Sequence, residues 1–573
     1  MDPLINKRHT LAHLLATVVL EHDPSAKLGI GPTIENGFYY DFQLSKPITD
    51  ADLPTLTKAM QKLVKKGLEM KGNEVGADEA RTMFASQPFK VELIDEYAGE
   101  GKTLTAYTIG EFTDLCKGGH ADSTKDIDPD SFVLQRVAGA YWRGDETKQM
   151  LTRVYGIAFE TKAELEAHLK QLEDAKNRDH RKIGKEQDLF VFSELVGPGL
   201  PLWTPKGTLL RDVLDGYVWE LRKKAGYERV DIPHITKKDL YEKSGHWEKF
   251  REELFRVSSR EGHEFALKPM NCPHHTQIYD RHPHSYKELP IRYANTTKVY
   301  RDEQTGELGG LTRVRAITQD DAHVFCRTSQ IAEELNTIWD IIETFYTKFG
   351  FTLRVRLSLH DPNHFEKYIG SKENWQVAED ALRAVVKSRE ETVDEAPGES
   401  AYYGPKLDFM ATDSLGRTWQ VATAQLDMNM PERFDLTCVN ESGAKERIVM
   451  IHAAIMGSLE RFIAVLLEHT GGALPTWASP IQVAVLTLSD KVTDYGVKVS
   501  EELTAAGVRA VLDADNESIG KKIRVWQLQK VPYMLVIGPK EAEASTVSVR
   551  SREKGDEGAM SVANVISSVQ ASA

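Results

Sequence analysis

Apolar residues near the start of the chain recur with the period of a helix. Four of them stand at positions i, i+3, i+4 and i+7: Leu11, Leu14, Leu15 and Val18. They follow Asp2 and Pro3, a capping residue and a proline suited to the first helical position. The pattern predicts a helix, and because residues four apart share a helix face, His9 and His13 are expected side by side.

Beyond this helix the pattern becomes β-like. Residues 28–42, LGIGPTIENGFYYDF, are punctuated by glycine, and mixed segments continue to AYWRGD at 140–145. Residues 1–160 are therefore predicted to form an α+β domain. Residues 161–186 are rich in charge and poor in helix breakers, which is typical of a solvent-exposed linker helix.

Two further domains follow. Residues 187–474 mix helices with β-rich runs such as IRYANTTKVYRDE and LRVRLSLH, which favours a large sheet-centred domain. Residues 475–573 alternate strand and helix in the order VAVLTL, DYGVKVSEELTAAG, VRAVLD, SIGKKIRVWQLQ and YMLVIG. This alternation predicts an α/β domain with a parallel sheet. A chain of 573 residues is in any case too long for one hydrophobic core.

Composition narrows the class of protein. With 41% hydrophobic and 28% charged residues, no basic-then-apolar leader and no bilayer-length apolar run, the chain is expected to be cytoplasmic and free of membrane contact. Its four cysteines are too scattered for a disulfide scaffold, so reduced or metal-bound thiols are expected. The net charge of -14 argues against indiscriminate coating of nucleic acid, although a local basic surface for tRNA remains compatible with it.

One cysteine and two histidines of the large domain are candidate metal ligands. Cys272 lies in KPMNCPHH, His323 in ITQDDAHVF, and His452 in VMIHAAIMGS, before a predicted helix. Each residue alone is more often structural. Together they form a Cys-His-His set with an open fourth position, as catalytic zinc requires.

Arginines and a carboxylate surround this set. Arg301 and Glu303 are predicted on one strand, followed by a glycine-rich turn and a return strand that carries Arg313 and Arg315. Guanidinium groups on one face of such a hairpin suit a triphosphate, because they pair bidentately with phosphate oxygens. Arg461 follows small residues at the start of a helix and is expected to reach the far end of the nucleotide.

These blocks resemble the three signature motifs of class II aminoacyl-tRNA synthetases. The first is LLRDVLDGYVWELRKKAGYERVDIP, the second runs from VYRDE through RVRAITQDD, and the third is GSLERF. KPMNCP, TQDDAHVF, YYGPKLDF, TAQLDM and MIHAAIMGS narrow the resemblance to the threonyl-tRNA synthetase family, over nearly the whole chain. The resemblance implies an antiparallel-sheet catalytic domain, a homodimer formed through the first motif, and threonine, ATP with Mg²⁺ and tRNA(Thr) as reactants.

The resemblance also implies roles for particular residues. The zinc ligands would be Cys272, His323 and His452. ATP would be contacted by Arg301, Glu303, Arg313, Gln420 and Arg461. Threonine would be held by the metal with Gln319, Asp321, Tyr403 and Gln425, and Lys406 of YYGPKLDF belongs to the same substrate site. His246 and Gln425 would lie near the transfer of the aminoacyl group to the terminal adenosine.

Zinc that ligates both the amine and the side-chain hydroxyl of threonine would reject valine, which has no second donor atom. Serine lacks only a methyl group, a difference worth about 1 to 3 kcal/mol, so some serine would be charged. The N-terminal domain offers His9, His13, Cys116 and His120, which by residue type resemble a zinc site, while His9 and His13 can equally be a structural helix face. With Lys90 and Asp114, the set resembles the editing domain of threonyl and alanyl synthetases, and in the threonyl branch this implies hydrolysis without metal.

Residues 475–573 resemble the family's anticodon-binding domain. The matching positions are Asn516, Arg524, Glu541 and Arg550, whose side chains can read unstacked bases. Lys521 and Lys522 can supply charge nearby. The small ubiquitin-like domain with which the usual bacterial enzyme begins is expected to be absent from this chain.

The chain departs from the family's usual motifs at four places. Ala316-Ile317 replaces a Gly-Phe pair whose ring stacks on adenine, and Ala453 replaces an arginine. Gly118-Gly119-His120 replaces Gly-Pro-His, which loosens a turn, and Ser518 replaces a lysine. Two alternatives stay open: a class II synthetase for serine or proline, and a non-catalytic tRNA-binding paralogue, which would be expected to lose some of the three arginines Arg301, Arg313 and Arg461.

Overall fold

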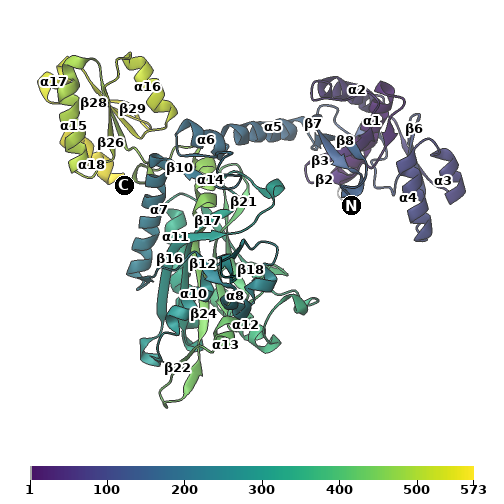
Figure 1. Cartoon of the computed structure of the whole chain (residues 1–573). Helices are drawn as coiled ribbons and strands as arrows, with labels where there is room; N and C mark the ends of the chain where they lie inside the picture. The colour runs from purple at the N-terminus through teal and green to yellow at the C-terminus, as the bar shows by residue number, and fades with distance from the viewer. Residues whose placement is uncertain (1–2, 573) are drawn as a thin grey trace. The chain divides into compact units, whose positions relative to one another are not determined.

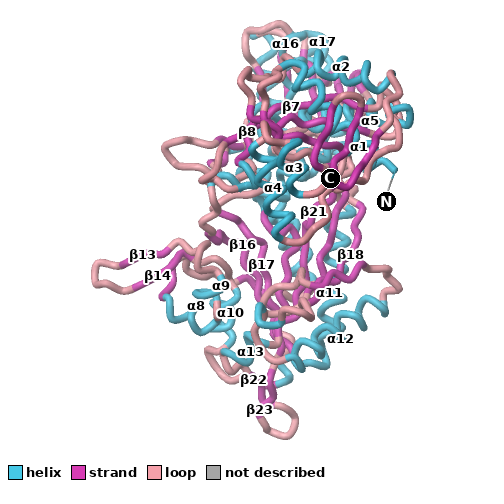
Figure 2. Tube along the Cα trace, turned by 90° about the vertical axis from the view of Figure 1, so that its right-hand side faces the viewer, coloured by secondary structure: helices cyan, strands magenta, loops and turns pink. Residues whose placement is uncertain are grey.

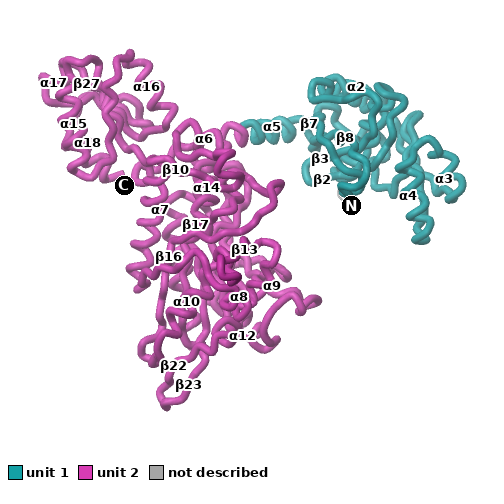
Figure 3. Tube along the Cα trace, in the orientation of Figure 1, with its two compact units in different colours: residues 1–173 teal, residues 174–573 magenta. Residues whose placement is uncertain are grey.

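The computed structural model describes residues 3–572 and divides into two compact units, residues 1–173 and 174–573 (Figure 3). The boundary falls inside α5 (Lys162–Asn177), a charged helix in which Leu165 is the buried residue. The predicted linker is broken after α5 and resumes as α6 (His180–Glu186), which Asp179 caps by accepting a hydrogen bond from the Arg181 backbone. The linker is therefore two helices rather than one.

The first unit has two antiparallel sheets with helices packed on them (Figure 1). One sheet has the order β1-β3-β8-β7 with β2 beside β3, and the other has the order β4-β5-β6. The helices are α1 (Pro3–His22), α2 (Leu53–Lys65), α3 (Ala77–Met83) and α4 (Pro88–Gly99). The strands are β1 (Lys27–Leu28), β2 (Thr33–Ile34), β3 (Gly37–Gln43), β4 (Met70–Glu74), β5 (Thr105–Ile109), β6 (Phe112–Leu115), β7 (Phe132–Tyr141) and β8 (Met150–Ala158).

The predicted N-terminal helix is α1. Its apolar stripe is buried in the core of the unit with Phe38, Tyr40 and Phe42 of β3. His13 lies on the buried side, and His9, one turn earlier, is half-buried. The predicted cap at Asp2 lies outside the described residues.

The larger part of the second unit is built on an eight-stranded sheet of order β11-β16-β17-β24-β21-β20-β18-β19, antiparallel except at the two edge pairs (Figure 2). Its helices are α7 (Pro205–Lys224), α8 (Lys238–Ser244), α9 (His246–Lys249), α10 (Cys272–Tyr279), α11 (Ile331–Thr347), α12 (Lys372–Ser388), α13 (Asn429–Arg433) and α14 (Leu459–Thr470). The strands of the sheet are β11 (Glu228–Arg229), β16 (Ile291–Tyr300), β17 (Ala316–Cys326), β18 (Thr352–Leu359), β19 (Asp394–Pro397), β20 (Lys406–Thr412), β21 (Thr418–Asp427) and β24 (Val449–Ser458). Smaller sheets are formed by β9 (Phe190–Val191), β10 (Leu202–Trp203), β12 (Ile235–Lys237), β13 (Arg256–Ser258), β14 (Glu264–Leu267), β15 (His284–Ser285), β22 (Thr437–Val439) and β23 (Lys445–Arg447).

The predicted arginine hairpin exists as β16 and β17, but its arginines are not on the strands. β16 ends at Tyr300 and β17 begins at Ala316, so Arg301, Glu303 and Arg313 lie in the intervening loop. Arg315 holds the base of this loop, because its guanidinium donates to the Glu303 carbonyl at 2.8 and 3.0 Å. The prediction of strand residues on one face was therefore wrong, and a braced loop presents them instead.

The C-terminal domain is α/β, with the sheet order β26-β25-β27-β28-β29. Its elements are β25 (Val483–Thr487), α15 (Thr493–Ala505), β26 (Ala510–Asp513), α16 (Ile519–Leu528), β27 (Tyr533–Ile537), α17 (Pro539–Ala544), β28 (Val547–Ser551), β29 (Gly555–Met560) and α18 (Val562–Ala571). The first three strands are parallel, as predicted, but β28 and β29 are antiparallel. The six-residue α17 is too short for a parallel crossover, so the chain returns in the opposite direction.

Candidate functional sites

The three predicted zinc ligands meet on one face of the large sheet. His323 of β17 and His452 of β24 are paired in register, which places their side chains on the same face. Cys272 reaches the same place from the first turn of α10. All three are buried, and their ligand atoms lie within 4.8 Å of one another. The three residues are far apart in the sequence, and the register of β17 with β24 brings the two histidines together.

Hydrogen bonds around the two histidines orient their lone pairs. Asp427 Oδ2 lies 2.9 Å from His452 Nε2, which assigns the His452 proton to Nε2 and leaves a lone pair on Nδ1. His452 Nδ1 lies 3.0 Å from His323 Nε2, and His323 Nδ1 lies 2.7 Å from His275 Nδ1. The His452 Nδ1 lone pair therefore points toward His323 Nε2, and the ligand atoms of both histidines lie within 4.8 Å of the Cys272 thiol. One thiol and two imidazoles so close together are a donor set that fits zinc.

The register of the sheet places further polar side chains beside His452. Gln425 of β21 pairs with His452, and Lys406 of β20 pairs with Gln425. The Tyr403 hydroxyl donates to Gln425 Oε1, and the Tyr403 ring lies 5.0 Å from the His452 ring. These predicted threonine contacts therefore border the Cys-His-His cluster.

Asp321 and His246 border the cluster from two other sides. Asp321 Oδ1 lies 3.7 Å from His323 Nε2, and Asp321 Oδ2 accepts a hydrogen bond from Asn271 at 3.0 Å. His246 is fully buried, with Nε2 3.7 Å from Cys272 Sγ, and burial lowers its pKa to about 3. His246 thus lies beside the candidate metal site in its uncharged form.

A cleft of about 660 Å³ is lined in part by residues of β17, β21 and β24, the strands that carry His323, Gln425 and His452. It is lined by all five residues that the resemblance assigns to ATP, together with Gln319: Arg301, Glu303, Arg313, Gln420 and Arg461. Glu303 accepts from Arg313 at 2.8 Å, which fixes that guanidinium at the cleft. The Arg301 guanidinium lies over the Phe250 ring at 5.5 Å, and its buried Nε has no hydrogen-bond partner among residues 3–572. An anion in the cleft would satisfy it.

Asp408 orients Gln420, one of the residues that line the cleft. This fully buried carboxylate accepts from Gln420 Nε2 at 2.7 Å and pairs with Lys406 Nζ at 2.8 Å and Arg356 at 3.1 Å. Gln420 and Lys406 are therefore held in fixed orientations. Sequence reasoning missed Asp408, which stands in the quoted YYGPKLDF block but carries no spacing signal of its own.

The departures at 316–317 and 453 can now be located. Ile317 lines the cleft, so an aliphatic side chain stands there, and the same cleft is lined by Trp419, whose ring lies 5.7 Å from the Arg461 guanidinium. Ala453 is buried in the sheet, where its carbonyl accepts from Arg222 at 3.3 Å. Nothing in the structure explains the alanine side chain at 453.

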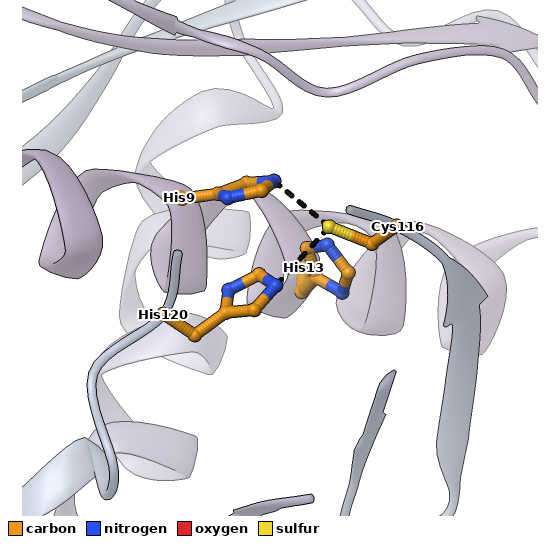
Figure 4. Close-up of side chains that lie close together, drawn as sticks. All are labelled: His9, His13, Cys116 and His120. Atoms are coloured by element: carbon orange, nitrogen blue, oxygen red, sulfur yellow. Dashed lines mark hydrogen bonds between the residues drawn. The ribbon is translucent and has the colours of Figure 1, made fainter. Parts of the chain in front are cut away.

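The four predicted editing donors of the first unit also converge (Figure 4). His9 and His13 come from α1, and Cys116 and His120 from the segment after β6. Cys116 Sγ lies 3.3 Å from His9 Nε2 and 3.2 Å from His120 Nε2, as the dashed lines in Figure 4 show. The four ligand atoms lie within 4.8 Å of one another, so metal-binding geometry is present here too.

Burial keeps these groups uncharged. It lowers the pKa of His9, lowers that of His13 well below its usual value, and lowers that of His120 to about 2. It raises the pKa of the Cys116 thiol to about 11. His9 Nδ1 donates to the Gly119 carbonyl at 3.2 Å, so the lone pair belongs to Nε2, which faces Cys116 Sγ at 3.3 Å.

The turn that carries this carbonyl depends on glycine. Gly119 has φ +86°, a value closed to proline, whose ring fixes φ near -65°. The replacement of the family's proline therefore does more than loosen the turn: it allows a left-handed backbone whose carbonyl orients His9.

Lys90 and Asp114 complete the cavity, which has a volume of about 930 Å³ and is lined by both residues and by His9, His13 and Cys116. Lys90 Nζ lies 2.6 Å from Asp114 Oδ1, and each side chain is only 2% exposed. Tyr40, which sequence reasoning missed, donates its hydroxyl to Asp114 Oδ2 at 2.6 Å. Asp114 therefore fixes the position of the buried Lys90 ammonium group, and Tyr40 fixes Asp114.

The predicted anticodon residues lie on separate elements of the C-terminal domain. Asn516 precedes α16, Arg524 lies on α16, and both are exposed, while Arg550 lies on β28. Glu541 caps α17 by accepting from the Gly538 backbone at 2.9 Å. The expectation for Lys522 was wrong: it is buried and donates to the Thr487 and Asp513 carbonyls at 3.0 Å.

Three protein-family models match the chain. They are the tRNA synthetase class II core domain (G, H, P, S and T) at residues 255–470, the anticodon binding domain at 482–572, and the threonyl and alanyl tRNA synthetase second additional domain at 104–155. The threonine--tRNA ligase of Porphyromonas gingivalis is 49% identical over 564 residues, covering 97% of this chain and 85% of the relative. The chain belongs to the threonyl-tRNA synthetase family.

Other threonyl-tRNA synthetases agree with this assignment. The threonine--tRNA ligase of Synechocystis sp. is 44% identical, covering 98% of this chain and 94% of the relative. The crystal structure of the RNA binding domain of threonyl-tRNA synthetase from Cryptosporidium parvum is 38% identical with a TM-score of 0.66, covering 69% of this chain and 98% of that one. The class II core and the editing-type domain expected from the sequence are confirmed.

Within the part of the chain that the structure describes, no helix has the length and apolar character needed to cross a bilayer.

Sequence reasoning missed His275 and Asp427, the partners of the two candidate zinc-binding histidines. His275 stands three residues after Cys272 and Asp427 ends the TAQLD run, so both lay inside quoted motifs without a spacing that marks them.

Proposed function

We propose that the chain activates threonine with ATP, transfers it to tRNA(Thr) in the catalytic cleft, and hydrolyses mischarged seryl-tRNA(Thr) in the N-terminal cavity. The proposal rests on two separate cavities. The predicted ATP contacts line one of them, and predicted editing residues line the other. Membership of the threonyl-tRNA synthetase family supplies the substrates.

In the activation step, the threonine carboxylate attacks the α-phosphorus of ATP and pyrophosphate leaves. Arg301 and Arg313 are proposed to neutralise phosphate oxygens, and Arg461 to contact the far end of the nucleotide, where Mg²⁺ accompanies ATP as substrate. Glu303 holds Arg313 at 2.8 Å, so this guanidinium is oriented before ATP binds. Gln420 is proposed to contact the nucleotide from the position that Asp408 fixes.

In amino-acid recognition, Cys272, His323 and His452 would hold one zinc ion, and Asp427 and His275 would orient the two rings. The ion supplies Lewis-acid ligation of an amine and a neighbouring hydroxyl, which valine lacks. Gln319, Asp321, Tyr403, Gln425 and Lys406 are proposed to contact threonine from the surrounding faces. In the transfer step a ribose hydroxyl of the terminal adenosine attacks the adenylate carbonyl and AMP leaves, close to His246 and Gln425.

In editing, water attacks the carbonyl carbon of the seryl ester, and the ribose oxygen leaves with a proton. His9 is proposed as the general base, because its Nε2 carries the lone pair and burial lowers its pKa. Lys90, which Asp114 holds at 2.6 Å, is proposed to stabilise the negative oxygen of the tetrahedral intermediate. Cys116 contacts the rings of His9 and His120 through its thiol, and the His13 ring packs against both of these rings. No metal is required for these steps.

The remaining partners follow from the C-terminal domain and the surface. Asn516, Arg524, Glu541 and Arg550 are proposed to bind the anticodon of tRNA(Thr). A homodimer is proposed because five apolar side chains are exposed in and between β9 and β10, just before the first motif: Val191, Phe192, Leu195, Val196 and Leu202. Leu195 is 100% exposed, and a second subunit would bury its side chain. A cytoplasmic location accords with these partners.

The test is aminoacylation of tRNA(Thr) with threonine, serine and valine, with and without a chelator, alongside amino-acid-dependent pyrophosphate exchange. We expect exchange with threonine, weaker exchange with serine, none with valine, and stable charging with threonine alone. Exchange that depends on proline, or that serine drives better than threonine, would point to another class II specificity. No exchange with any amino acid would indicate a non-catalytic paralogue.

A further inference from the structure

His180, the first residue of α6, contacts two elements that carry residues of the catalytic cleft, α14 and the loop between β16 and β17. It is buried, with 4% of its surface exposed. Its Nδ1 lies 2.6 Å from Glu468 Oε1, and its backbone N–H donates to the same oxygen at 3.1 Å. Its Nε2 accepts a hydrogen bond from the Leu311 backbone N–H at 3.0 Å.

The partners fix how the imidazole is protonated and turned. The Leu311 N–H can only donate, so Nε2 must carry the lone pair. The Glu468 carboxylate accepts, so the ring proton belongs on Nδ1. Both ring nitrogens are satisfied, and a flipped ring would lose both contacts. His180 is therefore held in one orientation between a helix and a loop.

The loop is the one that presents the phosphate-binding residues. Leu311 is fully buried and stands two residues before Arg313. Its neighbour Gly310 has φ +62°, and a Cβ there would lie 2.4 Å from His180 Nε2, so the loop backbone packs directly on the imidazole. At its base the loop is held again, where the Arg315 N–H donates to the Gly199 carbonyl at 2.8 Å.

The helix is the one that carries the third arginine. Glu468 lies on α14, seven residues after Arg461, and therefore on the same side of the helix two turns away. Arg417 holds Glu468 from its other side, so this carboxylate is a fixed anchor. A rigid connection thus runs from α14 through His180 to the loop.

We propose that His180 is a positioning residue for nucleotide binding: it fixes the loop that carries Arg313 relative to the helix that carries Arg461, so that both guanidinium groups face the same cleft. The inference rests on the proposed use of ATP in that cleft. In this proposal the first residue of α6 supports nucleotide binding in addition to its place in the linker.

Two substitutions separate the contacts of His180. The side-chain amide of His180→Asn reaches about as far as Nδ1, so it can donate to Glu468 but not reach Leu311. The side-chain carbonyl of His180→Gln reaches about as far as Nε2, so it can accept from Leu311. Lys182→Ala is the control, because Lys182 is exposed on the same helix.

The assay is threonine-dependent pyrophosphate exchange with the full chain, with KM measured for ATP and for threonine. We expect His180→Asn to raise the KM for ATP about tenfold, the effect of one lost hydrogen bond to a buried N–H. The KM for threonine should change less than about twofold. His180→Gln should restore most of the ATP affinity, and Lys182→Ala should match wild type.

Melting temperatures of all variants distinguish positioning from packing. Gly310→Ala is a second probe, since its methyl group would push the loop away from His180 and should also raise the KM for ATP. Equal KM values for ATP in wild type and His180→Asn would overturn the inference. So would equal losses of stability and rate in the Asn and Gln variants with the KM for ATP unchanged. A wild-type chain without threonine-dependent exchange would instead refute the proposed function.

Discussion

Replacing His9 with alanine is the sharpest test of the editing cavity. The substitution removes the ring whose Nε2 faces Cys116 and whose Nδ1 donates to Gly119. If His9 is the general base, hydrolysis of seryl-tRNA(Thr) should slow by about 10²- to 10⁴-fold, the usual contribution of a positioned base. This corresponds to roughly 3 to 5 kcal/mol of activation free energy.

The fold should survive this change. His9 is half-buried at the cavity wall, and the neutral hydrogen bond that it loses contributes about 1 kcal/mol to stability. Lys90→Ala is a poorer probe, because it would leave the Asp114 carboxylate buried without its cation, at a cost of about 3 to 5 kcal/mol. Threonine activation should not change, because the cleft lies in the other compact unit.

The assay is deacylation of preformed seryl-tRNA(Thr), with threonine charging measured in parallel. His22→Ala is the matched control: it removes an exposed histidine from the end of the same helix. Adding His13→Ala to His9→Ala should slow hydrolysis little further, because groups that act on one water behave as a unit. Equal deacylation by wild type and the double variant would show that both histidines are only a helix face, and the editing proposal would be wrong.

The rate of deacylation should change with pH in the direction that the lowered pKa of His9 sets. Burial lowers the pKa of His9 below 6.5, so the base form predominates at neutral pH and above. Wild-type deacylation should therefore stay constant as the pH falls to neutral and should decline only below the lowered pKa. A rate that already falls with a midpoint above 6.5 would contradict this environment for the base.

Three further predictions concern the catalytic domain. Elemental analysis should find one zinc per wild-type chain and almost none in Cys272→Ala, while Cys438→Ala, which removes another buried thiol, should keep its zinc. Asp427→Asn should weaken zinc affinity by about 10- to 100-fold in chelator competition, because the carboxylate that orients His452 is lost; unchanged affinity would argue against that role. Arg301→Ala should reduce threonine-dependent pyrophosphate exchange by at least about 10²-fold, whereas Arg260→Ala, at an exposed site, should not, and exchange within tenfold of wild type would refute the phosphate contact.

Periodicity and motif order predicted much of this architecture. The helical spacing of Leu11, Leu14, Leu15 and Val18 gave the correct helix and the correct neighbours His9 and His13. Local signals fix such elements because the residues that decide them are close in sequence. The convergence of His323 and His452 could not be deduced from spacing, since it depends on the register of two strands. The family resemblance supplied that information.

The errors have physical causes as well. Arg301 and Glu303 were predicted on one strand and Arg313 on the return strand. All three lie in a loop, in which the Arg315 guanidinium donates to the Glu303 carbonyl. β28 runs antiparallel to β27 because the six-residue α17 between them is too short to cross the sheet. Lys522 looked like a surface charge but is buried against carbonyls, a contact that only the folded chain supplies.

The two units have separate hydrophobic cores, and every residue of the N-terminal core comes from the N-terminal unit. Damage to that core would therefore have an unusual phenotype. A cell carrying it would still make threonyl-tRNA at a normal rate and would grow well when serine is scarce. Its proteome would accumulate serine at threonine codons as serine became abundant. Mutations in the first 173 residues should thus appear as losses of translational fidelity under serine stress, and a screen for viability alone would overlook them.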